Sequence, residues 1–214
     1  MSESGATAAY RGYRLQAYYV LSRVLKEGEA ETNVFHPEGS EDLNIENATG
    51  NLLEAVQVKS YGNLVLSNLS PEKNASFFHR ALDLLKTNEH ARISLVNFGH
   101  FGPEIDEAWK RDGEHRDRIS QKLHEFGYKA EEIKLIFNHI QLVELSEEAV
   151  RTEIFSKLQE QTEGIDPANA FELLLYWLYL QSETQTRIKY TDLIEKLLSV
   201  GKFLSERYQH LQEW

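Results

Sequence analysis

Three polar side chains on two short alternating segments carry the clearest chemical potential in this sequence. Asp42 alternates with leucine and isoleucine in residues 41–45, and Gln57 and Lys59 alternate with valines in residues 53–59. Alternation of this kind is typical of β-strands with one buried face and one polar face. Such polar residues are often only a solvated surface, and their functional interpretation depends on how the two strands pair.

The predicted pairing brings the three side chains together. A turn centred on Thr49 and Gly50 would join the two strands in a β-hairpin. In that register Asp42 lies opposite Gln57 on the same face, with their Cα atoms about 4.5–5.5 Å apart. Lys59 shares this face, two residues further along the strand. The register therefore predicts a polar cluster that could surround one cation.

A carboxylate, an amide oxygen and an ammonium on one sheet face favour metal-assisted hydrolysis of a phosphodiester. Hard oxygen ligands bind Mg²⁺ while the ion keeps several of its waters. The metal would position or acidify the attacking water, and the lysine would stabilise the negative charge that develops on the phosphate. Mn²⁺ is expected to substitute for Mg²⁺.

Gln16 is the fourth candidate, on a helix predicted over residues 10–26. Its spacing from Tyr13 and Val20 places it on the apolar face of that helix. A buried amide without a partner costs about 1–3 kcal/mol, so Gln16 needs a polar neighbour. It could be a core glutamine bonded to the backbone, or it could reach the metal or the phosphate above the hairpin.

The remaining patterns place this hairpin in an α/β (α+β) chain. We expect a central mixed β-sheet flanked by helices, followed by a helical C-terminal part. The expected division is a flexible leader at 1–9, a core at 10–145 and a helical extension at 146–214. The other predicted elements are a helix at 77–86, a strand at 91–98, one or two helices in 104–128, a strand at 133–137, and helices at 146–161, 168–181 and 190–210.

The composition limits the partners that such a chain could have. Its 214 residues carry 23 Lys and Arg against 34 Asp and Glu, a formal net charge of -11, so a nucleic acid would have to meet a local basic patch. Arg11 and Arg14 on the first helix offer one. The absence of cysteine excludes thiol chemistry and disulfides. The longest apolar run, residues 173–180, is too short to span a bilayer, and we expect a cytoplasmic protein.

These motifs carry a family resemblance. The helix with Gly12, Tyr13 and Gln16, then Glu41 and Asp42 in one strand, and Gln57-Val58-Lys59-Ser60 at the end of the next resemble the PD-(D/E)xK nuclease superfamily in its D…QxK form. More closely, the pattern is similar to the double-strand DNA endonuclease domain of bacterial anti-phage effectors, found in CD-NTase-associated nucleases and STAND-type ATPases. The resemblance implies a restriction-endonuclease-like core and a Mg²⁺-dependent DNA endonuclease.

The resemblance also implies roles for individual residues. Asp42 would be the acidic metal ligand, Gln57 would occupy the usual glutamate position, Lys59 would be the catalytic lysine and Gln16 the active-site residue of the helix. Amides at positions where related nucleases often have carboxylates would leave the backbone carbonyl of Val58 as a further metal ligand. Glu41 and Tyr13 are second-tier candidates. For Glu41 the reason is that strand alternation directs it to the opposite face unless the strand bulges.

Three functions remain open on the sequence alone. The first is the endonuclease acting on double-stranded DNA, with Arg11 and Arg14 on the substrate, a fused sensor or ATPase module, and a homo-oligomer as the active form. The second is a nuclease-fold domain that binds without catalysis. The third is an interaction or oligomerisation module in which the polar face of the hairpin is only solvated. Convergence of Asp42, Gln57 and Lys59 would separate the first two from the third.

Overall fold

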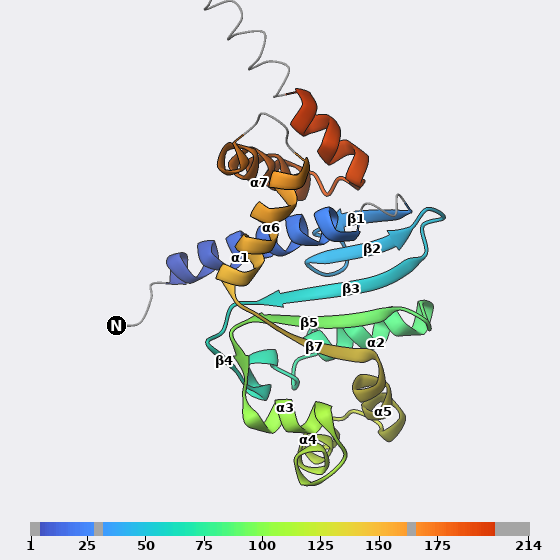
Figure 1. Cartoon of the computed structure of the whole chain (residues 1–214). Helices are drawn as coiled ribbons and strands as arrows, with labels where there is room; N and C mark the ends of the chain where they lie inside the picture. Colours follow the sequence, from blue (N-terminus) through green and yellow to red (C-terminus); the bar gives the residue numbers. More distant parts are fainter. Residues whose placement is uncertain (1–4, 28–31, 162–165, 200–214) are drawn as a thin grey trace, which may run out of the picture.

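The described residues fold into a five-stranded sheet with helices on both of its faces (Figure 1). The computed structural model describes residues 5–27, 32–161 and 166–199. The labelled helices are α1 (Gly5–Glu27), α2 (Phe77–Thr87), α3 (Pro103–Lys110), α4 (Glu114–Glu125), α5 (Ala130–His139), α6 (Glu147–Gln161) and α7 (Pro167–Glu183), and residues 190–199 form one more. The strands are β1 (Asn33–Pro37), β2 (Leu43–Asn47), β3 (Leu52–Lys59), β4 (Asn63–Leu64), β5 (Arg92–Phe98), β6 (His100–Phe101) and β7 (Ile140–Leu145).

The sheet is mixed, as the sequence predicts. Its order is β1-β2-β3-β5-β7, with antiparallel pairing among the first three strands and parallel pairing from β3 through β5 to β7. Strands β3 and β5 therefore end at the same edge, where Lys59 pairs with Asn97. Strands β4 and β6 form a separate parallel pair directly beyond this edge.

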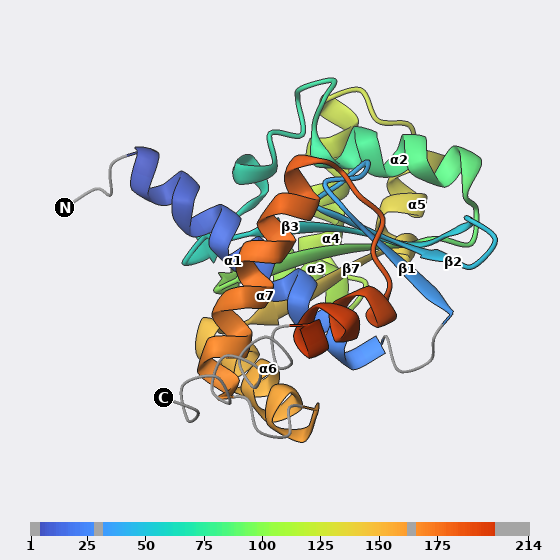
Figure 2. The same ribbon diagram turned by 90° about the horizontal axis from the view of Figure 1, so that it is seen from above.

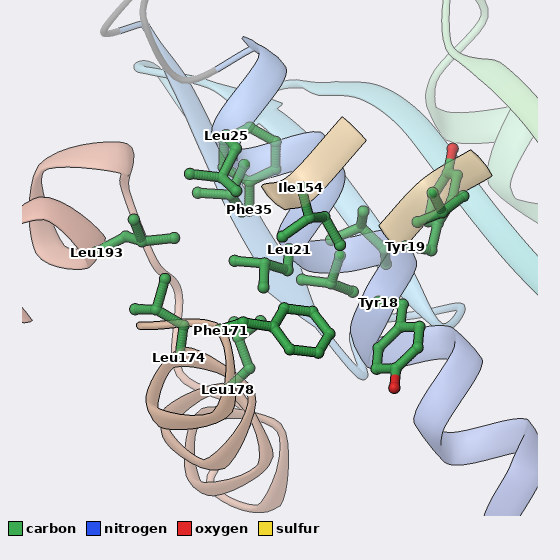
Figure 3. Packing of buried hydrophobic residues seen from close by; sticks show 14 of the residues in the cluster. Tyr18, Tyr19, Leu21, Leu25, Phe35, Ile154, Phe171, Leu174, Leu178 and Leu193 are labelled. Atoms are coloured by element: carbon green, nitrogen blue, oxygen red, sulfur yellow. The ribbon is translucent and has the colours of Figure 1, made fainter. Parts of the chain in front are cut away.

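One face of the sheet packs against α1, α6 and α7 (Figures 1 and 2). Figure 3 shows aromatic and aliphatic side chains of these helices meeting, among them Tyr18, Leu21 and Phe171. The rings of Tyr18 and Phe171 lie 5.2 Å apart between centroids. Val56 and Val58 of β3 belong to the same core, which confirms the predicted inward direction of these valines.

The opposite face is covered by helices α2 to α5, which pack over Ala55, Ile93 and Leu95 of the central strands. Alternation along β3 therefore sends its valines to one core and Ala55, Gln57 and Lys59 toward the other face. Near the end of β3 this second face is polar. The candidate site lies at this end of β3, where residues of α1 also reach it.

Helix α1 combines a buried half and an exposed half. Its buried residues begin at Leu15 and continue to Leu25, whereas residues 5–10 are exposed. In Figure 2 the first turns of α1 project beyond the body of the molecule. The helix begins at Gly5, earlier than the predicted residue 10, and residues 1–4 lie outside the described residues.

Other elements of the described chain also differ from the sequence predictions. Residues 133–137 are part of helix α5 and not a strand, and the strand follows at Ile140–Leu145. Buried Ile133 and Ile136 are three residues apart, so the periodicity of this short apolar run fits a helix as well as a strand. Strand β1 was not predicted, and residues 200–210 of the last predicted helix lie outside the described part of the chain.

The described helices include none with the length and apolar character needed to cross a membrane.

Candidate functional site

Asp42 and Gln57 meet as the predicted register requires. Leu43 pairs with Val56 in the β2–β3 ladder, which places the preceding residue, Asp42, beside Gln57. Asp42 Oδ2 accepts hydrogen bonds from Gln57 Nε2 and, at 2.6 Å, from the backbone N–H of Val58. Asp42 precedes strand β2, so its carboxylate accepts the Val58 N–H that has no backbone partner on that strand at this point. The hairpin register is confirmed near the site, although a bulge shifts it between Ile45 and Glu46.

Arg80 fixes the orientation of the Gln57 amide. Its Nη2 donates to Gln57 Oε1 at 2.8 Å, while Asp42 accepts from Gln57 Nε2. An amide oxygen cannot donate to Asp42 and an amide nitrogen cannot accept from Arg80, so both neighbours demand the same orientation. Gln57 is 6% exposed, and both ends of its side chain are satisfied.

Glu41 joins this network through the same arginine. Arg80 Nε and Nη2 donate to Glu41 Oε1 and Oε2 at 2.7 and 3.0 Å, and Nη1 donates to the carbonyl of Ala75. Residues 38–42 form a turn before β2, so strand alternation does not apply to Glu41. The sequence does not predict Arg80 as a site residue, because it lies in helix α2 and no local pattern connects that helix to the hairpin.

Gln16 has the polar neighbour that its position requires. Its Nε2 donates to Glu38 Oε1 at 2.5 Å and lies 3.4 Å from the carbonyl oxygen of Asp42. Glu38 also closes the turn, because its N–H donates to the same carbonyl. Its φ of 52° lies in the left-handed region that non-glycine residues seldom adopt. Glu38 was not a candidate in the sequence, which offers no periodic signal in this turn.

Three carboxyl groups of the site are harder to ionise than they would be in water. Burial raises the pKa of Asp42, more than the Val58 N–H, the Lys59 charge and the Gln57 amide lower it. Burial also raises the pKa of Glu41 and of Glu38, and the nearby charge of Asp42 adds to both shifts. A cation bound beside these carboxyl groups would favour their ionised forms and lower their pKa values.

Lys59 is partly exposed and lies where the site meets a cavity. It lines a cavity of about 580 Å³ with Arg11, Gln16, Asp42 and Gln57, which we call the α1–β3 pocket. Lys59 forms no ion pair within 4.0 Å among the residues that the structure describes. Its charge still acts on both Asp42 and Glu41. Asp42, Gln57, Lys59 and Gln16 therefore converge, as expected.

The segment after Lys59 is held from strand β5. Asn97, which is fully buried, donates to the carbonyls of Tyr61 and His100 and accepts from the N–H of Tyr61. Gly99 lies so close that an added Cβ would stand 2.1 Å from the Tyr61 carbonyl oxygen. This clamp fixes the rim of the pocket formed by Ser60, Tyr61 and Gly62.

The remaining candidates lie at different distances from the site. Arg11 lines the α1–β3 pocket, whereas Arg14 pairs with Glu147 of α6 at 3.0 Å. Tyr13 lines the pocket but is 61% exposed, so its predicted place on a buried helix face is wrong. The first half of α1 is exposed, because no element among the described residues covers the apolar side chains there.

The donor set fits a divalent cation only when a phosphate accompanies it. No cluster of three or more His, Cys, Asp or Glu side chains suited to a metal occurs among the described residues. Asp42 Oδ1 accepts no hydrogen bond from them, so one carboxylate oxygen is available, but the oxygen of Gln57 faces Arg80. Mg²⁺ commonly binds through one carboxylate, waters and the phosphate of its ligand. Asp42 would hold such an ion.

The fold is similar to a part of the structures of SAVED/CARF-domain containing receptors. A Cap4 receptor of this class from Acinetobacter baumannii, solved with the cyclic trinucleotide 3'3'3'-cAAA, matches with a TM-score of 0.59 at 11% identity over 92% of this chain and 44% of that chain. The Cap4 receptor of Moraxella osloensis matches with a TM-score of 0.56 at 13% identity, over 87% of this chain and 47% of its own. The chain thus spans less than half the length of these receptors.

A further structure of the Acinetobacter baumannii receptor, with the cyclic trinucleotide 2'3'3'-cAAA, matches with a TM-score of 0.56 at 12% identity. No family model and no curated protein matches the sequence. At these identities the likeness establishes the fold, which confirms the expected α/β class with a mixed sheet.

The comparisons correct two expectations from the sequence. The Moraxella osloensis and Acinetobacter baumannii structures are described as receptors, and none of them is described as a PD-(D/E)xK nuclease. The expected family, and with it the predicted function as a double-stranded DNA endonuclease, is therefore wrong. A short D…QxK spacing on a hairpin indicates a polar cluster, which the structure contains, but does not identify a family. The expected relation to a longer protein agrees with the greater length of the receptors.

Proposed function

We propose that this chain is part of a cytoplasmic anti-phage receptor protein that responds to a cyclic oligonucleotide. In this proposal the α1–β3 pocket binds a phosphodiester group of the ligand together with Mg²⁺. The observation that carries it is the convergence of Arg11, Lys59 and Asp42 in one cavity of about 580 Å³. The cyclic trinucleotides bound by receptors of the same fold support this choice of ligand.

The charges of the pocket suit a phosphodiester with a cation better than either alone. Lys59 and Arg11 supply the positive charge that attracts a phosphate. Asp42 would repel the phosphate unless a cation stood between them, and Mg²⁺ typically bridges one or two carboxylates and a phosphate in this way. Mn²⁺ would substitute, since it prefers the same oxygen ligands.

Binding of 3'3'3'-cAAA measured by calorimetry tests the proposal. The unsubstituted protein should bind the trinucleotide in Mg²⁺ and lose most of its affinity in EDTA. Lys59→Ala should weaken binding about 10- to 100-fold, the range for one lost charged hydrogen bond. Lys86→Ala is the matched control, because Lys86 lies on α2 in an exposed pair with Asp83 and lines no part of the pocket. Absence of binding, or equal loss in both variants, would refute the proposal.

Hydrolysis of the bound phosphodiester is a second candidate, favoured by Lys59 lying two residues from Gln57 and acting on Asp42. Water would add across one P–O bond and leave a phosphomonoester and a hydroxyl group. Bound Mg²⁺ would supply charge neutralisation, and Lys59 would stabilise the additional charge on the phosphate. Mass spectrometry of the trinucleotide after incubation with Mg²⁺ would detect the linear product, which Lys59→Ala should not form.

A further inference from the structure

A second cavity adjoins the α1–β3 pocket on the other side of Gln16. It has a volume of about 240 Å³ and lies between α1 and α7, and we call it the α1–α7 pocket. Tyr13 and Gln16 line both cavities. A ligand that fills one cavity can therefore extend into the other past these two side chains.

The walls of the α1–α7 pocket combine aromatic rings with hydrogen-bond acceptors. Tyr13 of α1 and Tyr179 of α7 line it, and Val20 and Leu178 give it an apolar floor. Glu38 contributes a carboxylate whose Oε1 is bonded to Gln16, and no described residue donates to its Oε2. Flat apolar space beside a tyrosine, with a carboxylate oxygen at its edge, is complementary to an aromatic heterocycle that carries an amino group.

We propose that the α1–α7 pocket binds one amino-bearing base of the nucleotide ligand whose phosphodiester occupies the α1–β3 pocket. This inference rests on the proposed function and specifies which part of the ligand each cavity takes. The volume favours a single ring system, since whole drug-sized ligands need pockets of about 300–1,000 Å³. Tyr179 stacks on the base, and Glu38 Oε2 accepts a hydrogen bond from its amino group.

Alanine substitution of two tyrosines on the same helix tests the base pocket. Tyr179 and Tyr176 are both exposed, at 41% and 64%, but only Tyr179 lines the cavity. Tyr179→Ala should weaken 3'3'3'-cAAA binding about 5- to 150-fold, the effect of losing one base–aromatic stack. Tyr176→Ala should bind as the unsubstituted protein does. Ribose 5-phosphate, which has no base, should bind both variants equally.

The outcomes separate this inference from the proposed function. If Lys59→Ala weakens trinucleotide binding and Tyr179→Ala has no more effect than Tyr176→Ala, the phosphodiester site stands and the base pocket is refuted. If Tyr179→Ala weakens ribose 5-phosphate as much as the trinucleotide, Tyr179 supports the pocket in general and the base assignment is also refuted. If the unsubstituted protein does not bind the trinucleotide, both proposals fail together.

Discussion

Removing the Arg80 side chain should destabilise the fold through the carboxylate that it leaves behind. The Glu41 side chain is only 2% exposed, and Arg80 donates to both of its carboxylate oxygens as well as to Gln57. Removing one partner of a buried ion pair costs about 3–5 kcal/mol. The Arg80 side chain is 38% exposed, so solvent already screens part of the interaction. We therefore expect Arg80→Ala to lower the free energy of unfolding by roughly 2–3 kcal/mol.

Urea unfolding followed by circular dichroism measures this loss, which corresponds to a midpoint shift of about 1 M urea. Lys86→Ala on the same helix is the control and should change stability by less than about 0.5 kcal/mol, because its pair with Asp83 is exposed. Adding Glu41→Gln to Arg80→Ala should restore part of the loss by removing the buried charge. A small effect of Arg80→Ala, or no recovery in the double variant, would refute the reasoning.

The pH dependence of this variant has a defined sign. Burial raises the pKa of Glu41 in the folded protein above its ordinary value of 4.5, and loss of Arg80 would raise it further. An acid with a raised folded pKa destabilises the fold above that pKa, and the penalty disappears below the unfolded value. The stability gap between Arg80→Ala and the unsubstituted protein should therefore narrow as pH falls from 7 toward 4.5.

Three further substitutions probe other parts of the structure. Burial raises the pKa of Glu54, but hydrogen bonds and the charge of Arg23 lower it overall. The ionised Glu54 therefore stabilises the fold, and this contribution to the free energy of unfolding should disappear as pH falls below about 4.5. Acid unfolding of Glu54→Gln should not show this loss of stability. Asn97→Ala should lower the free energy of unfolding by about 1–3 kcal/mol per unsatisfied group in urea melts and weaken trinucleotide binding, because the Tyr61 segment loses its clamp. Leu21→Ala should cost about 2–5 kcal/mol through a cavity in the α1 core, which thermal unfolding would show.

The local part of the site was predictable because it depends on strand periodicity and a turn. Alternation placed Asp42 and Gln57 on one face, and the structure confirms that they contact each other. Arg80 and Glu38 were not predictable, since their role depends on where α2 packs and on an unusual backbone angle in a turn. The strand predicted at residues 133–137 is wrong, because an apolar run of five residues fits both periods and these residues belong to helix α5.

The two halves of helix α1 should differ in local stability. Its buried residues start at Leu15, so opening the second half costs core contacts, whereas residues 5–10 can unfold from the end of the helix at little cost. Backbone amides should accordingly exchange with solvent quickly in the first turns and slowly beyond Leu15. Ala8 and Ala9 line the α1–β3 pocket from these first turns, and Arg11 follows directly after them. A ligand in this pocket would therefore spend part of its binding free energy on holding these turns, and protection of their amides would report occupancy.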